Sequence, residues 1–212
     1  MWKMTAIGPA FHRRSVAAVV LRPLLPRRLL GGARHRSRGR LSVVAEGWEW
    51  VRIQTDACPQ CGHNPARTPV HSLGGEGIES ATDWGQFLSG VDQGYLRTSP
   101  APGVWSPIQY AAHVRDMLRV FGDRILLAVE EDSPIVPWFD PSEEEWDRYN
   151  KLDPGDVASD VAVQADRLAA ILEDRRDQDW DRTAVRDGVD HFTVAGMACF
   201  AVHEAHHHLL DA

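Results

Sequence analysis

The chain has 212 residues and a formal charge of −7, and its composition, 43% hydrophobic and 25% charged, is that of a soluble globular protein. Residues 1–45 carry ten basic side chains and no acidic one, whereas the remainder carries 13 basic and 30 acidic residues. This acidic body excludes nucleic acid as a partner, and no apolar run approaches the roughly 20 residues of a membrane span. The three cysteines exclude a secreted disulfide scaffold and favour a cytoplasmic protein.

The chain divides into three parts. Residues 1–44 form an arginine-rich extension, interpreted as a disordered tail or a start site placed too early rather than a transit peptide. Residues 45–75 form an irregular segment that opens with Trp48 and Trp50 and contains a Cys-Pro-x-Cys-Gly motif. This tryptophan-rich segment also allows a homodimer. Residues 76–212 are the predicted helical body.

Helical periodicity predicts four helices in this body, over about 77–97, 106–131, 153–176 and 194–212. Ser106-Pro107 and Asp153-Pro154 each combine a capping side chain with a proline at the first helical position, and Thr193 caps the last helix. With little strand signal elsewhere, the fold class is all-α, a four-helix bundle. The connection over 132–152 is long enough to cross the bundle, so the second and third helices could run parallel.

The last helix carries the most informative motif, a run of histidines with one glutamate. His203 and His207 are four residues apart, so both side chains lie on one face and could bind one metal ion. The run also matches the H-E-x-x-H pattern of zinc peptidases, in which Glu204 would be the general base. The few residues that follow His207 offer no downstream third ligand, so we expect that ligand from upstream. Glu204 points about 100° away from His203 and is expected in solvent, while His206 and His208 are secondary candidates.

The second helix offers an upstream ligand. His113 lies between Tyr110 and Met117 in the apolar stripe of this helix, where an imidazole needs a partner for its nitrogens. It is either a satisfied core histidine or a metal ligand. If His203 and His207 face the bundle interior, three imidazoles could meet there and leave an open position on the metal, as in catalytic sites.

Three stretches resemble the DinB superfamily, most closely its actinobacterial members: residues 105–116, Asp147-Arg148-Tyr149, and Phe192-Thr193-Val194 leading into the histidine run. The resemblance covers about residues 46–212. It implies a four-helix bundle that holds a divalent metal through His113, His203 and His207. Gly196 departs from the family's pattern, because an acidic residue there would complete the helix cap.

The resemblance also implies an activity. The superfamily includes metal-dependent thiol S-transferases that use mycothiol or bacillithiol, and mycothiol-dependent maleylpyruvate isomerases. We therefore expect a transferase that joins a low-molecular-weight thiol to a small electrophile, with zinc or nickel as the metal. A non-catalytic metal-binding bundle, an isomerase and a metal-dependent hydrolase are the alternatives. Candidate polar groups of the pocket, each also explicable as a surface residue, are Arg115, Asp147, Arg148 and Tyr149.

The cysteines are a separate signal. Cys58 and Cys61 form half of a zinc ribbon, and His63 or His71 could complete it, although neither spacing is standard. Two reduced structural thiols, a reversible disulfide and a small zinc knuckle remain open, in that order. Cys199, one turn before His203, is interpreted as a small core residue.

Overall fold

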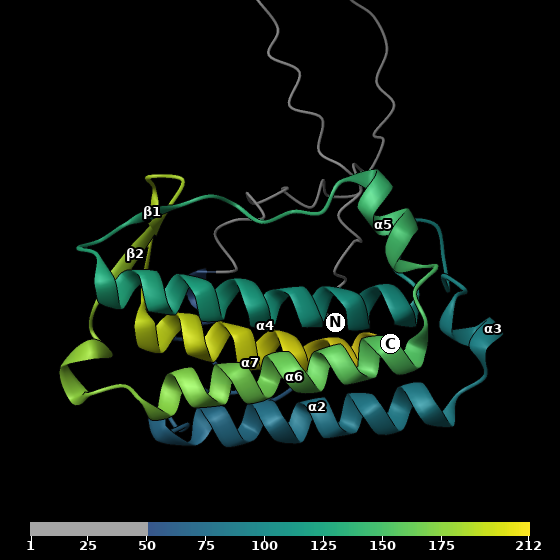
Figure 1. The fold of residues 1–212 in the computed structure, drawn as a ribbon, viewed down its shortest axis with the longest axis horizontal. Helices are drawn as coiled ribbons and strands as arrows, with labels where there is room; N and C mark the ends of the chain where they lie inside the picture. The colour runs from purple at the N-terminus through teal and green to yellow at the C-terminus, as the bar shows by residue number, and fades with distance from the viewer. Residues whose placement is uncertain (1–50) are drawn as a thin grey trace, which may run out of the picture.

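The computed structural model describes residues 51–212, so the predicted extension over 1–44 and the two tryptophans Trp48 and Trp50 lie outside the described residues. Within this range four long helices form a bundle, which confirms the predicted fold class (Figure 1). The helices are α2 (Leu73–Gly90), α4 (Pro107–Glu130), α6 (Pro154–Glu173) and α7 (Val194–Asp211). The shorter elements are η1 (Val70–Ser72), α3 (Gln93–Leu96), α5 (Glu143–Tyr149) and η2 (Asp177–Asp179). No helix in residues 51–212 is long and apolar enough to cross a membrane.

The bundle contains a crossover connection. Helix α2 packs against α6 and α7, and α4 packs against the same two helices, so α2 and α4 lie at diagonal corners. The segment after α4 returns along the length of the bundle to α5, and α6 then runs in the same direction as α4 (Figure 1). The parallel arrangement expected from the length of this connection is therefore confirmed. The Trp84 indole donates to the Ala205 carbonyl at 2.8 Å and joins α2 to α7 in the core.

Local capping explains where the helices begin and end. Ser106 and Gln109 form a capping box at the start of α4, and the Asp153 side chain accepts two backbone N–H groups at the start of α6, both as predicted. The first predicted helix, over about 77–97, is wrong beyond Gly90, where α2 ends. Val91 is extended, and the Asp92 side chain accepts the N–H groups of Gly94 and Tyr95, so a separate short helix begins there. Helix α6 ends at Glu173, three residues before the predicted end.

A small sheet that the sequence analysis did not predict covers one end of the bundle. Its strands are β1 (Ile135–Val136), β2 (Thr183–Arg186) and β3 (Asp190–Thr193), in the order β1-β2-β3. Strands β2 and β3 are antiparallel, while β1 pairs with β2 in parallel and joins the crossover to this hairpin. The hairpin turn holds Asp187 and Gly188 at positive φ, the pattern typical of an Asp-Gly turn. That dipeptide was the signal for the sheet.

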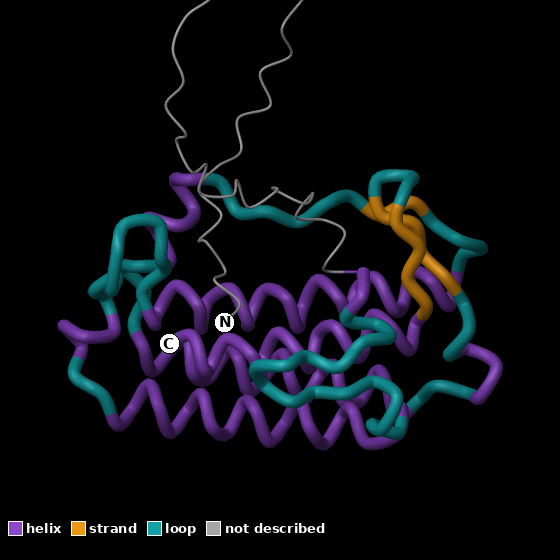
Figure 2. Tube along the Cα trace, turned by 180° about the vertical axis from the view of Figure 1, so that it is seen from behind, coloured by secondary structure: helices purple, strands orange, loops and turns teal. Residues whose placement is uncertain are grey.

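The segment before α2 lies across the bundle as a loop, which Figure 2 shows from behind. Gln54 fastens it: the side-chain amide donates to the His191 carbonyl at 3.1 Å, and its oxygen accepts the Thr193 N–H at 3.3 Å. A Cβ at Gly196 would lie 2.0 Å from that oxygen. The departure at Gly196 therefore has a structural reason, because Gln54 occupies the space at this helix start and supplies an acceptor there.

Candidate metal centres

Helix α7 brings two groups of metal-ligating side chains together on neighbouring faces. In each group the candidate ligand atoms all lie within 4.8 Å of one another. We call the first the Cys–His group; it comprises Cys58, Cys61, His203 and His207. We call the second the His–Glu group; it comprises His113, Glu204 and His208.

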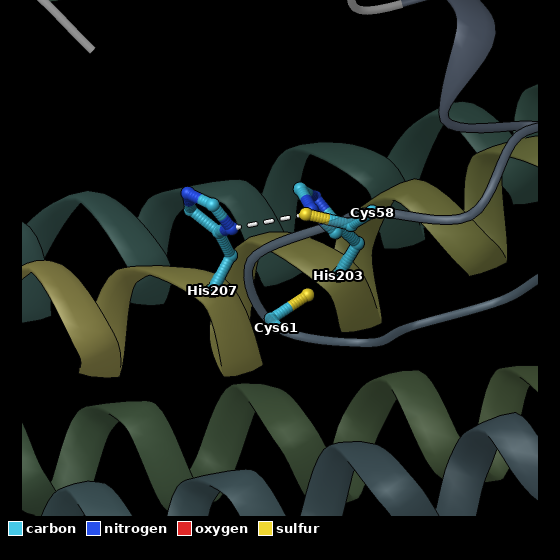
Figure 3. Close-up of side chains that lie close together, drawn as sticks. All are labelled: Cys58, Cys61, His203 and His207. Carbon is cyan, nitrogen blue, oxygen red and sulfur yellow. Dashed lines mark hydrogen bonds between the residues drawn. The ribbon is translucent and has the colours of Figure 1, made fainter. Parts of the chain in front are cut away.

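The Cys–His group joins the N-terminal loop to α7. His203 and His207 lie one turn apart on α7, and the loop passes over them so that both thiols point toward the imidazoles (Figure 3). The Cys58 Sγ lies 3.5 Å from the His207 Nδ1. Both cysteines are free in this structure. The two thiols and two imidazoles of this group are therefore close enough to bind a single metal ion.

The electrostatics of this group favour thiolates beside charged imidazoles. Burial alone would raise the pKa of Cys61, but the neighbouring His203 and His207 lower it to about 5. Burial alone would lower the pKa of His203, but the neighbouring Cys58 and Cys61 raise it to about 11. A site that stabilises two thiolates in this way is also one that a cation can occupy, because the metal takes over the role of the imidazole protons.

The His–Glu group joins α4 to α7. The Glu204 Oε2 lies 3.3 Å from the His113 Nε2 and 3.2 Å from the His208 Nε2. Glu204 is 1% exposed, so the expectation that it lies in solvent is wrong. The other nitrogen of His208, Nδ1, lies 2.9 Å from the Asp211 carboxylate. Asp211 therefore orients this imidazole from behind, as carboxylates do for metal-bound histidines.

The carboxylate in this group is ionised despite its burial. Burial would raise the pKa of Glu204, but the neighbouring His208 and His113 hold it well below its ordinary range. Burial lowers the pKa of His113, and the hydrogen bond with Glu204 only partly opposes that shift. The pKa of His208 is raised to about 9, because Glu204 and Asp211 outweigh the effect of burial. The group thus presents one buried negative charge between two imidazoles.

A pocket opens onto the His–Glu group. It is partly open to solvent, and His113 and Glu204 line it. Its walls are mostly aromatic, and two arginines, Arg124 and Arg186, lie in the lining. The aromatic residues come from the segment just before α4, from α4 itself, from the crossover with α5, and from α7: Trp105, Phe121, Trp138, Phe139, Trp146 and Phe200. The crossover predicted as a packed aromatic loop is therefore one wall of this pocket.

The metal ligands predicted from the resemblance are divided between the two groups. The structure brings His203 and His207 together, as their spacing predicts, but joins them with Cys58 and Cys61. It places His113 with Glu204 and His208. The three-histidine set stays a prediction, and the structure offers two other ligand sets beside it. Neither His63 nor His71 completes the cysteine pair: His63 packs beside His203 with 5.9 Å between ring centroids, and His71 contacts Trp180.

The predicted pocket residues lie elsewhere. Arg115 pairs with Asp116 at 2.9 Å, and the Tyr149 hydroxyl donates to the same carboxylate. Asp147 and Arg148 are exposed on α5. Within residues 51–212 none of these four predicted residues lines the aromatic pocket. The residues of the site that were missed, Arg124 and Arg186, come together only because the unpredicted sheet packs against α4. Cys199 is buried in the core, as predicted, and burial raises its pKa to about 11.

Comparison with known proteins identifies the family. The family model of the DinB superfamily matches residues 79–212, and the chain therefore belongs to this superfamily. YfiT from Bacillus subtilis, described as a probable metal-dependent hydrolase with an unusual four-helix bundle topology, is a similar solved structure. Its TM-score is 0.53 at 18% sequence identity, over 82% of this chain and 88% of that chain, a likeness that shows the fold. No curated protein matches the sequence.

Proposed function

We propose that this member of the DinB superfamily is a metal-dependent enzyme that acts on small molecules, with a divalent metal held by the His–Glu group. The observation that carries the proposal is the convergence of His113 and Glu204 on the floor of the aromatic pocket. Two imidazoles and one carboxylate form a ligand set common to catalytic metals, because three protein ligands leave positions for a substrate or nucleophile.

The residues present fit such a metal. The buried Nδ1 of His113 and Oε1 of Glu204 have no hydrogen-bond partner within residues 51–212. The buried negative charge of Glu204 favours a cation between the imidazoles, and Asp211 fixes the ring of His208. A bound metal supplies one kind of chemistry here: it stabilises the deprotonated form of a nucleophile, whether water or a thiol.

The pocket supports a substrate with an apolar body and an anionic group. Trp105 and Trp146 stack with their ring centroids 4.0 Å apart beside His113, and both rings line the pocket there. Arg186 forms an ion pair with Asp190 at 2.5 Å. Arg124 is buried and donates to the Pro137 carbonyl, but it forms no ion pair with any residue in 51–212. We propose that Arg124 binds the anionic group of the substrate, since a planar guanidinium suits a carboxylate.

Two reactions fit this arrangement. In the first, which the resemblance of the sequence implies, a low-molecular-weight thiol of the mycothiol type attacks a small electrophile. In the second, water attacks instead and the reaction is a hydrolysis; the description of YfiT as a probable metal-dependent hydrolase supports this alternative. The peptidase pattern is less well supported, because it leaves no role for His113, which contacts Glu204 directly.

Parallel assays on the full chain test this proposal. Thiol consumption with a chloro-dinitroaromatic electrophile reports transfer, and release of nitrophenol from activated esters with a carboxylate reports hydrolysis. We expect metal-dependent turnover in one of the assays, lost in His113→Ala and kept in His206→Ala, an exposed histidine on α7. Turnover that survives both chelation and His113→Ala would refute the proposal, as would its absence in both assays with the His–Glu group loaded.

A further inference from the structure

The Cys–His group lies outside the aromatic pocket and the proposed reaction does not use it. None of its four members is among the residues that line the pocket. It nevertheless gathers two thiols and two imidazoles from segments about 150 residues apart in the chain, since Cys58 and His207 are separated by 149 positions. Such a convergence calls for a ligand that all four side chains share.

The geometry matches a tetrahedral ion. With Zn–S distances of about 2.3 Å and Zn–N distances of about 2.0 Å, neighbouring ligand atoms lie roughly 3.3–3.8 Å apart. The separation of 3.5 Å between the Cys58 Sγ and the His207 Nδ1 equals one edge of that tetrahedron. All the candidate atoms lie within 4.8 Å of one another, so small side-chain rotations complete the remaining edges.

The side chains on α7 are also short of partners. Both ring nitrogens of His203 are buried and form no hydrogen bond with residues 51–212. A buried imidazole with neither nitrogen satisfied is costly, and a metal ion removes that cost. The outer nitrogen of His207, Nε2, lies 3.6 Å from the Asp211 carboxylate, which places a carboxylate behind this ring as well.

The loop between the cysteines has the conformation of a metal-binding turn. The Cys58 carbonyl accepts the Gly62 N–H at 3.0 Å, and the Cys58 N–H donates to the His63 carbonyl at 2.8 Å. Gly62 has φ of +78°, a value that side chains rarely adopt. These bonds fold the five-residue motif back on itself and present both sulfurs on one side, toward α7 (Figure 3).

We propose that Cys58, Cys61, His203 and His207 bind one Zn²⁺ ion in a closed site that fastens the N-terminal loop to α7. Two thiolates and two imidazoles at a tetrahedral point favour zinc over harder divalent cations. Because the protein fills all four positions, the ion is structural and leaves no place for a substrate. On binding, the protons that these four side chains hold leave to solvent, and the group coordinates as two thiolates and two neutral imidazoles, so no oxidant or reductant is involved.

Cobalt spectroscopy on the full chain without a histidine tag tests the site directly. After removal of bound metal, Co²⁺ is added, and we expect a thiolate-to-cobalt charge-transfer band together with the intense visible bands of tetrahedral cobalt. Zn²⁺ should displace both at one equivalent. The wild-type protein alone decides the matter, because a Co²⁺ complex without a thiolate band would overturn the proposal.

Variants then assign the ligands and separate this site from the proposed enzyme. Cys61→Ser and His207→Ala should lose the thiolate band or its tetrahedral intensity and one equivalent of zinc by elemental mass spectrometry. Cys199→Ala and His206→Ala are the matched controls. His113→Ala should keep the band in full, so a failed assay of turnover leaves this result intact. Equal zinc content in Cys61→Ser and wild type, with helical circular dichroism retained, would overturn the proposal, as would loss of the band in His113→Ala.

Discussion

Glu204→Gln is the substitution that most sharply separates the His–Glu group from the three-histidine set. Glutamine keeps the volume and one oxygen ligand but removes the only negative charge between His113 and His208. The carboxylate is 1% exposed and lies 3.2–3.3 Å from both imidazoles, so solvent does little to screen it. Breaking a buried charge pair costs about 3–5 kcal/mol. Taking the lower end, because the ligand oxygen remains, about 3 kcal/mol corresponds to roughly a hundredfold weaker metal binding.

The assay is a competition titration. The full chain, already loaded with one equivalent of zinc, is titrated with a second equivalent against a chromophoric chelator, and the dissociation constant is compared between variants. Glu79→Gln, on the exposed side of α2, is the matched control and should bind as wild type does. If Glu204→Gln binds the second metal with unchanged affinity while His207→Ala abolishes it, the three-histidine set holds that metal and the reasoning from the His–Glu group is refuted.

Three further substitutions test the supporting structure. Gly196→Ala should destabilise the protein by about 1 kcal/mol, measured by chemical denaturation, because the Gln54 side chain must move away and lose its hydrogen bonds. In a Gln54→Ala background the same substitution should stabilise the protein by about 1 kcal/mol, because alanine favours the helix more than glycine does. Equal effects in both backgrounds would contradict this coupling. Asp211→Asn should weaken the binding of both metals about 10- to 100-fold in chelator competition, because the carboxylate lies behind two ligand histidines; unchanged affinity for both metals would exclude that role. Tyr149→Phe should lower the free energy of unfolding by about 1 kcal/mol and Arg148→Ala should not change it, and neither should alter turnover; a change in turnover would return these predicted residues to the pocket.

The bundle could be predicted from the sequence because its signals are local. The caps at Ser106, Asp153 and Thr193 and the apolar periodicity that follows each of them depend only on neighbouring residues. The length of the crossover allowed α6 to run parallel to α4, and the structure has that arrangement. The sheet was missed because β1 has only two residues and β2 only four, too few for a periodicity to emerge. Its one local signal was the turn at Asp187 and Gly188.

The partners of the metal ligands depend on tertiary packing, which the sequence does not display. The interval of four between His203 and His207 predicts that they share an ion, and the structure does bring them together. Nothing in that interval shows that the loop with Cys58 and Cys61 crosses the same face of α7. The burial of Glu204 was unpredictable for a similar reason, because a glutamate is normally solvated unless other elements surround it with partners.

Helix α7 accommodates both groups because its histidine run contains two overlapping pairs at the same interval. His203 pairs with His207, and Glu204 pairs with His208. The members of each pair are four residues apart, and the second pair begins one residue after the first. One residue is about 100° of rotation on an α-helix, so the first pair faces the N-terminal loop while the second faces α4. The Glu204 Oε1 lies 3.5 Å from the His203 Nδ1, so the two faces meet at this residue. An ion on the loop side that fixes His203 would therefore also fix the carboxylate on the pocket side, and through this contact the proposed structural zinc would influence the proposed catalytic metal.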